Sequence, residues 1–179
     1  MRQRLLIYLV IGAALLGFGC EKEKRSISIS LIEELPRASV QANRPEKVGE
    51  KVFNIRKDSR RVLFMHAPST VEFSLLIPAR AELKFGVGMP THIWKFQGDG
   101  VLFRVEIDQG TDEDDVLFSS YINPKAVEAD RRWHDVTIDL STYEGQRVIL
   151  RFETDPGPEG NRTLDLAGFS EPTLTGLEW

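Results

Sequence analysis

The stretch VLFRVEID, residues 101–108, alternates apolar and polar side chains without a break. Successive side chains of a β-strand point to opposite faces of the sheet, so alternation of this kind predicts a strand with one buried face. The predicted buried face consists of Val101, Phe103, Val105 and Ile107. The opposite face carries Arg104, Glu106 and Asp108, as in a half-buried strand of an antiparallel sheet.

Short apolar segments of the same kind recur along the chain, separated by Gly, Pro, Asp and Asn. None has the 3.6-residue period of a long amphipathic helix. The predicted strands are 26–31, 51–55, 61–67, 71–77, 81–88, 101–108, 116–122, 134–140, 147–154 and 164–169. We expect a loop over 35–50 and a single helical turn within 124–132. The pattern predicts an all-β fold, an antiparallel sandwich or jelly roll.

The N-terminus has the order of a secretory signal: Arg2 and Arg4, an apolar run over 5–18, and small residues before Cys20, the one cysteine of the chain. The apolar run is shorter than the ~20 residues of a membrane-spanning helix. Residues 16–20, LGFGC, resemble the lipobox of bacterial lipoproteins, although Gly17 and Phe18 depart from its usual pattern. The alternative is an ordinary secretory signal with an incidental cysteine.

The resemblance implies cleavage before Cys20 and lipidation of its thiol, which would hold the protein to a membrane. It places the protein at the bacterial cell envelope, on the outer membrane or the exported face of the inner membrane; Glu21 favours the outer membrane. The expected organisation is a signal peptide over 1–19, a lipidated tether over 20–25 and a β-sandwich domain over 26–179.

Net charge argues against one class of partner, and the cysteine content indicates how the domain is stabilised. Without Arg2 and Arg4, 21 basic residues of the 23 remain against 27 acidic ones, a formal charge of −6. This excess of acid argues against nucleic acid as a partner. With no cysteine after Cys20, the exported domain forms no internal disulfide and depends on its hydrophobic core.

From about residue 71 onward, the order of short motifs resembles the galactose-binding-like jelly-roll superfamily, including carbohydrate-binding modules of bacterial surface proteins. The motifs are LKFGVG (83–88), GVLFRVEID (100–108), WHDVTIDLS (133–141), GQRVILRF (145–152) and DLAGFSEP (165–172). The resemblance implies the sandwich fold. It leaves sugar binding, protein binding and scaffolding open, because the superfamily uses one fold for all three.

The long segment 88–100 holds the candidate sugar site. An exposed aromatic ring stacks on the apolar face of a pyranose while polar groups bind its hydroxyls. The candidate ligand-binding residues are His92, Trp94, Lys95, Gln97 and Asp99. In the alternative interpretation, Ile93, Trp94 and Phe96 close the end of the sandwich, which is the more usual role of large apolar side chains.

An acidic cluster over 108–115 is the one candidate metal site. Asp108, Asp112 and Asp114 could hold a structural calcium, as galactose-binding-like domains often do, but their spacing does not match a calcium loop. A solvated acidic loop is the alternative. No other cofactor is expected.

The sequence offers little for catalysis. His66, His92 and His134 lie far apart and lack zinc-ligand spacing, and GFSE at 168–171 lacks the second glycine of a nucleophile elbow. We expect a non-enzyme. Two functions remain open: a membrane-anchored lipoprotein that binds carbohydrate, or a structural or protein-interaction lipoprotein that docks on an envelope protein.

Overall fold

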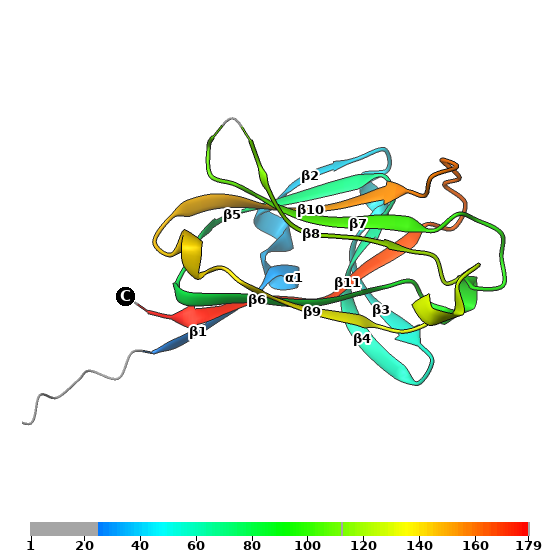
Figure 1. The fold of residues 1–179 in the computed structure, drawn as a ribbon, viewed down its shortest axis with the longest axis horizontal. Helices are drawn as coiled ribbons and strands as arrows, with labels where there is room; N and C mark the ends of the chain where they lie inside the picture. The colour runs from blue at the N-terminus through cyan, green and yellow to red at the C-terminus, as the bar shows by residue number, and fades with distance from the viewer. Residues whose placement is uncertain (1–24, 112, 179) are drawn as a thin grey trace, which may run out of the picture.

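The computed structural model describes residues 25–111 and 113–178, so the predicted signal segment and Cys20 lie outside it. Two antiparallel sheets face each other across a common core (Figure 1). The first sheet has the order β3-β4-β11-β6-β9, with β1 also paired to β11. The second has the order β2-β5-β10-β7-β8. The predicted all-β antiparallel sandwich is confirmed.

The strands are β1 (Ser26–Ser30), β2 (Ser39–Ala42), β3 (Val48–Ile55), β4 (Asp58–His66), β5 (Ser69–Leu76), β6 (Ala79–Gly88), β7 (Val101–Asp108), β8 (Asp115–Ile122), β9 (His134–Asp139), β10 (Arg147–Pro156) and β11 (Leu166–Leu177). Within residues 25–111 and 113–178 there is one α-helix, α1, which spans Leu31–Glu34. Single 3-10 turns are η1 (Leu35–Arg37), η2 (Pro45–Lys47), η3 (Thr91–Ile93), η4 (Glu128–Asp130) and η5 (Ser141–Tyr143). In the described ranges, no helix is long and apolar enough to cross a bilayer.

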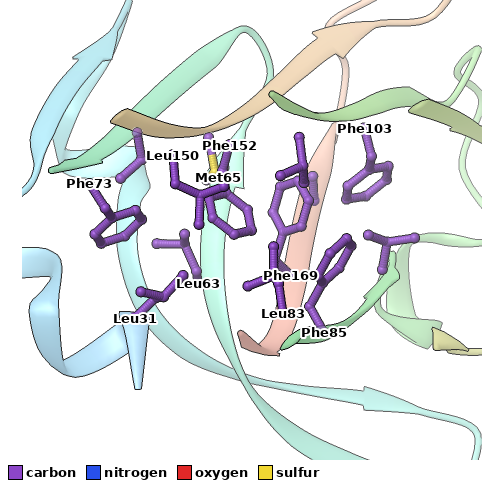
Figure 2. Packing of buried hydrophobic residues seen from close by; sticks show 14 of the residues in the cluster. Leu31, Leu63, Met65, Phe73, Leu83, Phe85, Phe103, Leu150, Phe152 and Phe169 are labelled. Carbon is purple, nitrogen blue, oxygen red and sulfur yellow. The ribbon is translucent and has the colours of Figure 1, made fainter. Parts of the chain in front are cut away.

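The core lies between the inner faces of the two sheets and is rich in phenylalanine (Figure 2). Phe169 on β11 is fully buried and meets three other rings edge to face. Its centroid lies 4.9 Å from that of Phe152, 5.2 Å from Phe103 and 5.8 Å from Phe85. Rings from β6, β7, β10 and β11 therefore join the two sheets, and the alternation predicted for 101–108 is confirmed by the burial of its apolar face.

A second apolar cluster lies on the opposite face of β4, because Val62 and Phe64 alternate with the core residues Leu63 and Met65. Phe53 and Ile55 from β3 complete this cluster together with Trp133. Glycines make room for it: a Cβ on Gly168 would lie 2.8 Å from the Phe53 ring. A Cβ on Gly88 would lie 2.5 Å from Ile55. Side chains of β3 therefore lie directly against the backbone of β11 and β6 on this face of the sheet.

The predictions for two segments near the start of the sandwich were wrong in detail. The segment 35–50 is not all loop: it contains the edge strand β2, and β3 already begins at Val48. Leu31 does not continue the first strand but begins α1, a helix that the sequence pattern had not predicted. A helix of four residues is too short to display a period, and the exposed strand β2 lacks alternating burial. The expected helical turn within 124–132 is present as η4.

Candidate functional site

Three connections meet at one end of the sandwich (Figure 1). They are 89–100 between β6 and β7, 123–133 between β8 and β9, and 157–165 between β10 and β11. These connections line shared cavities and are joined by hydrogen bonds. We call this surface the loop end.

The aromatic residues of 89–100 divide into two roles. Ile93 is fully buried in the core, and the indole of Trp94 packs partly buried against both apolar clusters. Trp94 Nε1 donates a hydrogen bond to the carbonyl oxygen of Met89, 2.9 Å away, which fixes the ring. Phe96 instead leaves 45% of its surface in solvent. Ile93 and Trp94 thus close the end of the sandwich, while Phe96 is the exposed aromatic ring of the loop.

Two adjoining cavities lie beside Trp94 and Lys95. The smaller, of about 340 Å³, is lined by Thr91, His92, Trp94, Lys95 and Arg131. The larger, of about 460 Å³, is lined by Trp94, Lys95, Phe96, Gln97, Gly98, Lys125, Ala126, Glu159 and Asn161. We call the larger one the Phe96 cavity. Four of the five predicted ligand-binding residues therefore line one or both cavities.

The fifth predicted residue, Asp99, has a different position. Only 6% of it is exposed, and it lines neither cavity. Its Oδ2 accepts hydrogen bonds from the backbone N–H groups of Glu159 (2.7 Å) and Asn161 (3.3 Å). Asp99 therefore positions the 157–165 connection, which brings Glu159 and Asn161 to the Phe96 cavity.

A buried ion pair lies beneath this cavity. Lys125 Nζ donates to the carbonyl oxygen of Thr163 (2.7 Å) and to Oδ1 of Asp165 (3.4 Å), and both charged side chains are almost inaccessible to solvent. Burial raises the pKa of Asp165 to about 6, outweighing the attraction of Lys125. A Cβ on Gly98 would lie 2.1 Å from Lys125 Nζ, so a larger residue at position 98 would require the lysine side chain to shift.

The predicted calcium residues make contacts of their own. Asp108 Oδ1 accepts from the backbone N–H of Gly110 (2.6 Å), and Asp114 forms an ion pair with Arg151. Asp112 is not among the residues that the structure describes. Within the described part of the chain, no three His, Cys, Asp or Glu residues are grouped to hold a metal ion. A structural calcium stays a prediction of the sequence resemblance.

The sequence did not indicate that Phe96 is the exposed ring. An irregular loop has no periodic pattern from which the burial of one aromatic side chain can be compared with that of its neighbour. Nor did the sequence indicate Arg131, Glu159 and Asn161, which lie far along the chain from residue 96. The turn-rich sequence PGPEGN over 156–161 did mark a loop. Only the strand order shows that this loop meets 89–100.

No protein-family model matches the chain. An uncharacterised protein of Archaeoglobus fulgidus is 38% identical over 136 residues, which cover 72% of this chain and 33% of that protein. The chain therefore spans about a third of the length of this relative.

Solved structures share the fold. A CBM51 module with its INT domain from Clostridium perfringens ZmpB, in complex with GlcNAc, has a TM-score of 0.58 at 15% identity, over 84% of this chain and 32% of that one. A CBM51 from a Clostridium perfringens GH95 protein, in complex with methyl-galactose, has a TM-score of 0.57 at 17% identity, over 83% and 99%. Tandem CBM51 modules of a Streptococcus pneumoniae family 98 glycoside hydrolase have a TM-score of 0.52 at 14% identity, over 83% and 47%. The resemblance to carbohydrate-binding jelly rolls is confirmed as a likeness of fold.

Proposed function

We propose that this protein is a non-catalytic carbohydrate-binding domain whose ligand occupies the Phe96 cavity. The observation that carries the proposal is the exposed Phe96 ring at the loop end, beside the polar side chains of Lys95, Gln97, Glu159 and Asn161. The fold shared with CBM51 modules adds support, since those modules were solved with GlcNAc and methyl-galactose.

The chemistry of the cavity suits a pyranose. The face of a sugar ring has C–H groups that stack on an aromatic ring, and its edge has hydroxyls that need both donors and acceptors. Phe96 offers the apolar surface, Lys95 donates, Glu159 accepts, and the amides of Gln97 and Asn161 do both. A neutral or charged monosaccharide unit can satisfy these groups without a metal.

The lining of the two loop-end cavities supports a binding role without catalysis. Hydrolysis of a glycosidic bond by the common mechanism uses two carboxyl groups on either side of that bond. Glu159 is the one carboxylate among the described residues that line these cavities. We therefore propose binding as the activity of this surface.

The strand register supports a membrane-tethered arrangement. Ser26, the first residue of β1, pairs with Leu177, which pairs with Ala79 at the start of β6. The connection 89–100 follows Gly88 at the other end of β6. Nine residue steps at ~3.3 Å separate the two ends of this strand by about 30 Å. The chain before Ser26 thus leaves the sandwich at the end opposite to the Phe96 cavity.

We propose that Cys20 is lipidated and holds the protein at the cell envelope. Five residues then separate the lipidated cysteine from Ser26, and the Phe96 cavity faces away from the membrane. Incorporation of a labelled fatty acid into the wild-type protein, and not into Cys20→Ser, is the expected result. Equal labelling of both proteins would contradict the anchor and leave the sugar site unaffected.

A glycan array probed with the purified protein tests the binding function. Saturable binding to at least one glycan class, reproduced by calorimetry with the free oligosaccharide, is expected. An array without binding, neutral and acidic glycans included, would contradict the proposal and favour the protein-interaction alternative.

A further inference from the structure

A third cavity lies on the other side of the 157–165 connection, between it and the β2–β3 and β4–β5 connections. Its volume is about 250 Å³. It is lined by Asn43, Arg44, His66, Ala67, Pro68 and Arg162. We call it the arginine cavity. Its lining includes two arginines, one histidine and one asparagine, and no aspartate or glutamate among the described residues.

The two arginines of this cavity are available to a ligand. Five of the other eleven arginines in the described ranges form ion pairs with carboxylates, among them Arg151 with Glu72 and Arg104 with Glu153. Neither Arg44 nor Arg162 forms a salt bridge with any residue in the described ranges. In a chain of net charge −4, two unpaired guanidinium groups on one small cavity are a local excess of positive charge.

The positive charges near the arginine cavity also affect the pKa of His66, another residue of its lining. Burial lowers the pKa of its imidazole, and the positive charges of Lys47, Arg44 and Lys125 lower it further. Its Nδ1–H donates to the carbonyl oxygen of Ala67, 3.1 Å away, which leaves Nε2 directed elsewhere. Cations from the β2–β3 and β8–β9 connections therefore act together on the side chain that lines the cavity wall.

Guanidinium groups bind oxyanions through paired N–H donors in a planar fork, and an amide N–H adds a further donor. Arg44 and Arg162, which line the arginine cavity together with Asn43, each carry such a fork. These N–H donors lack a negatively charged acceptor in the part of the chain that the structure describes. A carboxylate or a sulfate group has both the negative charge and the acceptor oxygens to bind them.

We propose that the arginine cavity binds the anionic substituent, a carboxylate or a sulfate, of an acidic glycan. As a statement about glycans, this inference rests on the proposed function. Asn161 lines the Phe96 cavity and the next residue, Arg162, lines the arginine cavity. Consecutive Cα atoms are ~3.8 Å apart, so one saccharide chain can contact both sides of this connection.

Inorganic sulfate tests the anion site without any sugar. In the nitrogen-15-labelled protein, sodium sulfate should shift the Nε–H signals of Arg44 and Arg162 saturably, with sodium chloride matching the ionic strength. The variant Arg162→Gln should weaken sulfate binding at least about tenfold, because charge-assisted hydrogen bonds are lost. Arg147→Gln, an exposed arginine at the far end of β10, should bind sulfate as the wild type does. Shifts that do not saturate, or that Arg162→Gln retains, would overturn the anion site.

A separate measurement tests whether the ligand of the arginine cavity is an acidic glycan. On an array of matched neutral and acidic glycans, the wild type should prefer sulfated or uronate-bearing members, and Arg162→Gln should lose that preference while keeping neutral binding. Sulfate binding without a preference for acidic glycans would overturn the glycan assignment and point to a free anion as ligand. An array without any glycan binding would overturn the proposed function, and the sulfate titration would still decide the anion site.

Discussion

The carboxylate of Asp99 accepts a hydrogen bond from the backbone N–H of Glu159, at 2.7 Å across 60 residues of sequence. This contact joins the connection that contains Phe96 to the connection that contributes Glu159 and Asn161. The Phe96 ring and the side chains of Glu159 and Asn161 come from different connections, so their relative placement depends on such contacts. Asp99 acts as a positioning residue between two of the three connections of the loop end, together with the hydrogen bond from the Gly157 N–H to the carbonyl oxygen of Gly100 (3.0 Å).

Replacing Asp99 by alanine should therefore weaken glycan binding although Phe96 is unchanged. The variant leaves two backbone N–H groups without their acceptor, and we expect a loss of about 1–3 kcal/mol in the free energy of unfolding. Asp139→Ala is the matched control, because Asp139 also accepts a backbone N–H, from Ser141, at the far end of the sandwich. Calorimetric titration and urea unfolding measure both effects. Equal glycan affinity in Asp99→Ala and Asp139→Ala would contradict the positioning role.

Asp165 should give the fold a characteristic dependence on pH. Its pKa rises from 3.8 to about 6 in the folded state, so the folded protein holds this proton more tightly than the unfolded chain. The stability it contributes is complete below about pH 3.8 and is lost as pH rises through 6. The stability difference between wild type and Asp165→Asn should therefore fall by about 2 kcal/mol from about pH 4 to pH 7. Urea midpoints at the two pH values measure this difference, and one that grows with pH would refute the assignment.

The strand faces were predictable because alternation reports burial directly. In β10, Val148, Leu150 and Phe152 are buried and belong to the core, as their spacing indicates. The extent of β11 was not predictable: the expected strand ended at Phe169, whereas β11 continues to Leu177. Glu171 adopts a positive φ, and the register of β11 with β6 shifts between Ser170 and Thr173. The strand is therefore irregular at this point, and the sequence pattern there resembles the end of a strand.

The second apolar cluster shows another limit of sequence reasoning, and it gives a prediction. Gly168 reads as a weak position within a strand, but its missing side chain makes space for Phe53. We expect Gly168→Ala to destabilise the fold by about 1–3 kcal/mol, since the Phe53 ring must move. Gly49→Ala is the control, because a Cβ there meets nothing within 4 Å. Thermal unfolding of both variants tests the contact, and equal midpoints would show that the hairpin adapts freely.

The phenylalanine cluster between the sheets should dominate the stability of the sandwich. Phe169→Ala removes a fully buried ring that touches three others, and we expect a loss of about 3–5 kcal/mol. Val52→Ala, at a side chain that is 66% exposed, should change stability by less than about 0.5 kcal/mol. Urea unfolding compares the two variants. A loss below about 1 kcal/mol for Phe169→Ala would mean that the core packs differently.

Four of the candidate binding residues predicted from the sequence line the cavities of the loop end, because a long polar loop with aromatic residues can be recognised from the sequence. The sequence did not show which aromatic ring of this loop is exposed. Trp94 and Phe96 are two residues apart in the same loop, and only the packing of Trp94 on both apolar clusters shows which one is left exposed.

The most direct test is calorimetric titration of the strongest glycan-array ligand into the wild type, Phe96→Ala and Leu76→Ala. Leu76 is exposed to nearly the same extent as Phe96, 44% against 45%, and lies at the opposite end of the sandwich. Loss of a stacked ring costs on the order of 1–2 kcal/mol, so Phe96→Ala should bind about fivefold to thirtyfold more weakly. Leu76→Ala should bind as the wild type does. Unchanged affinity in Phe96→Ala would contradict the assignment of the sugar site.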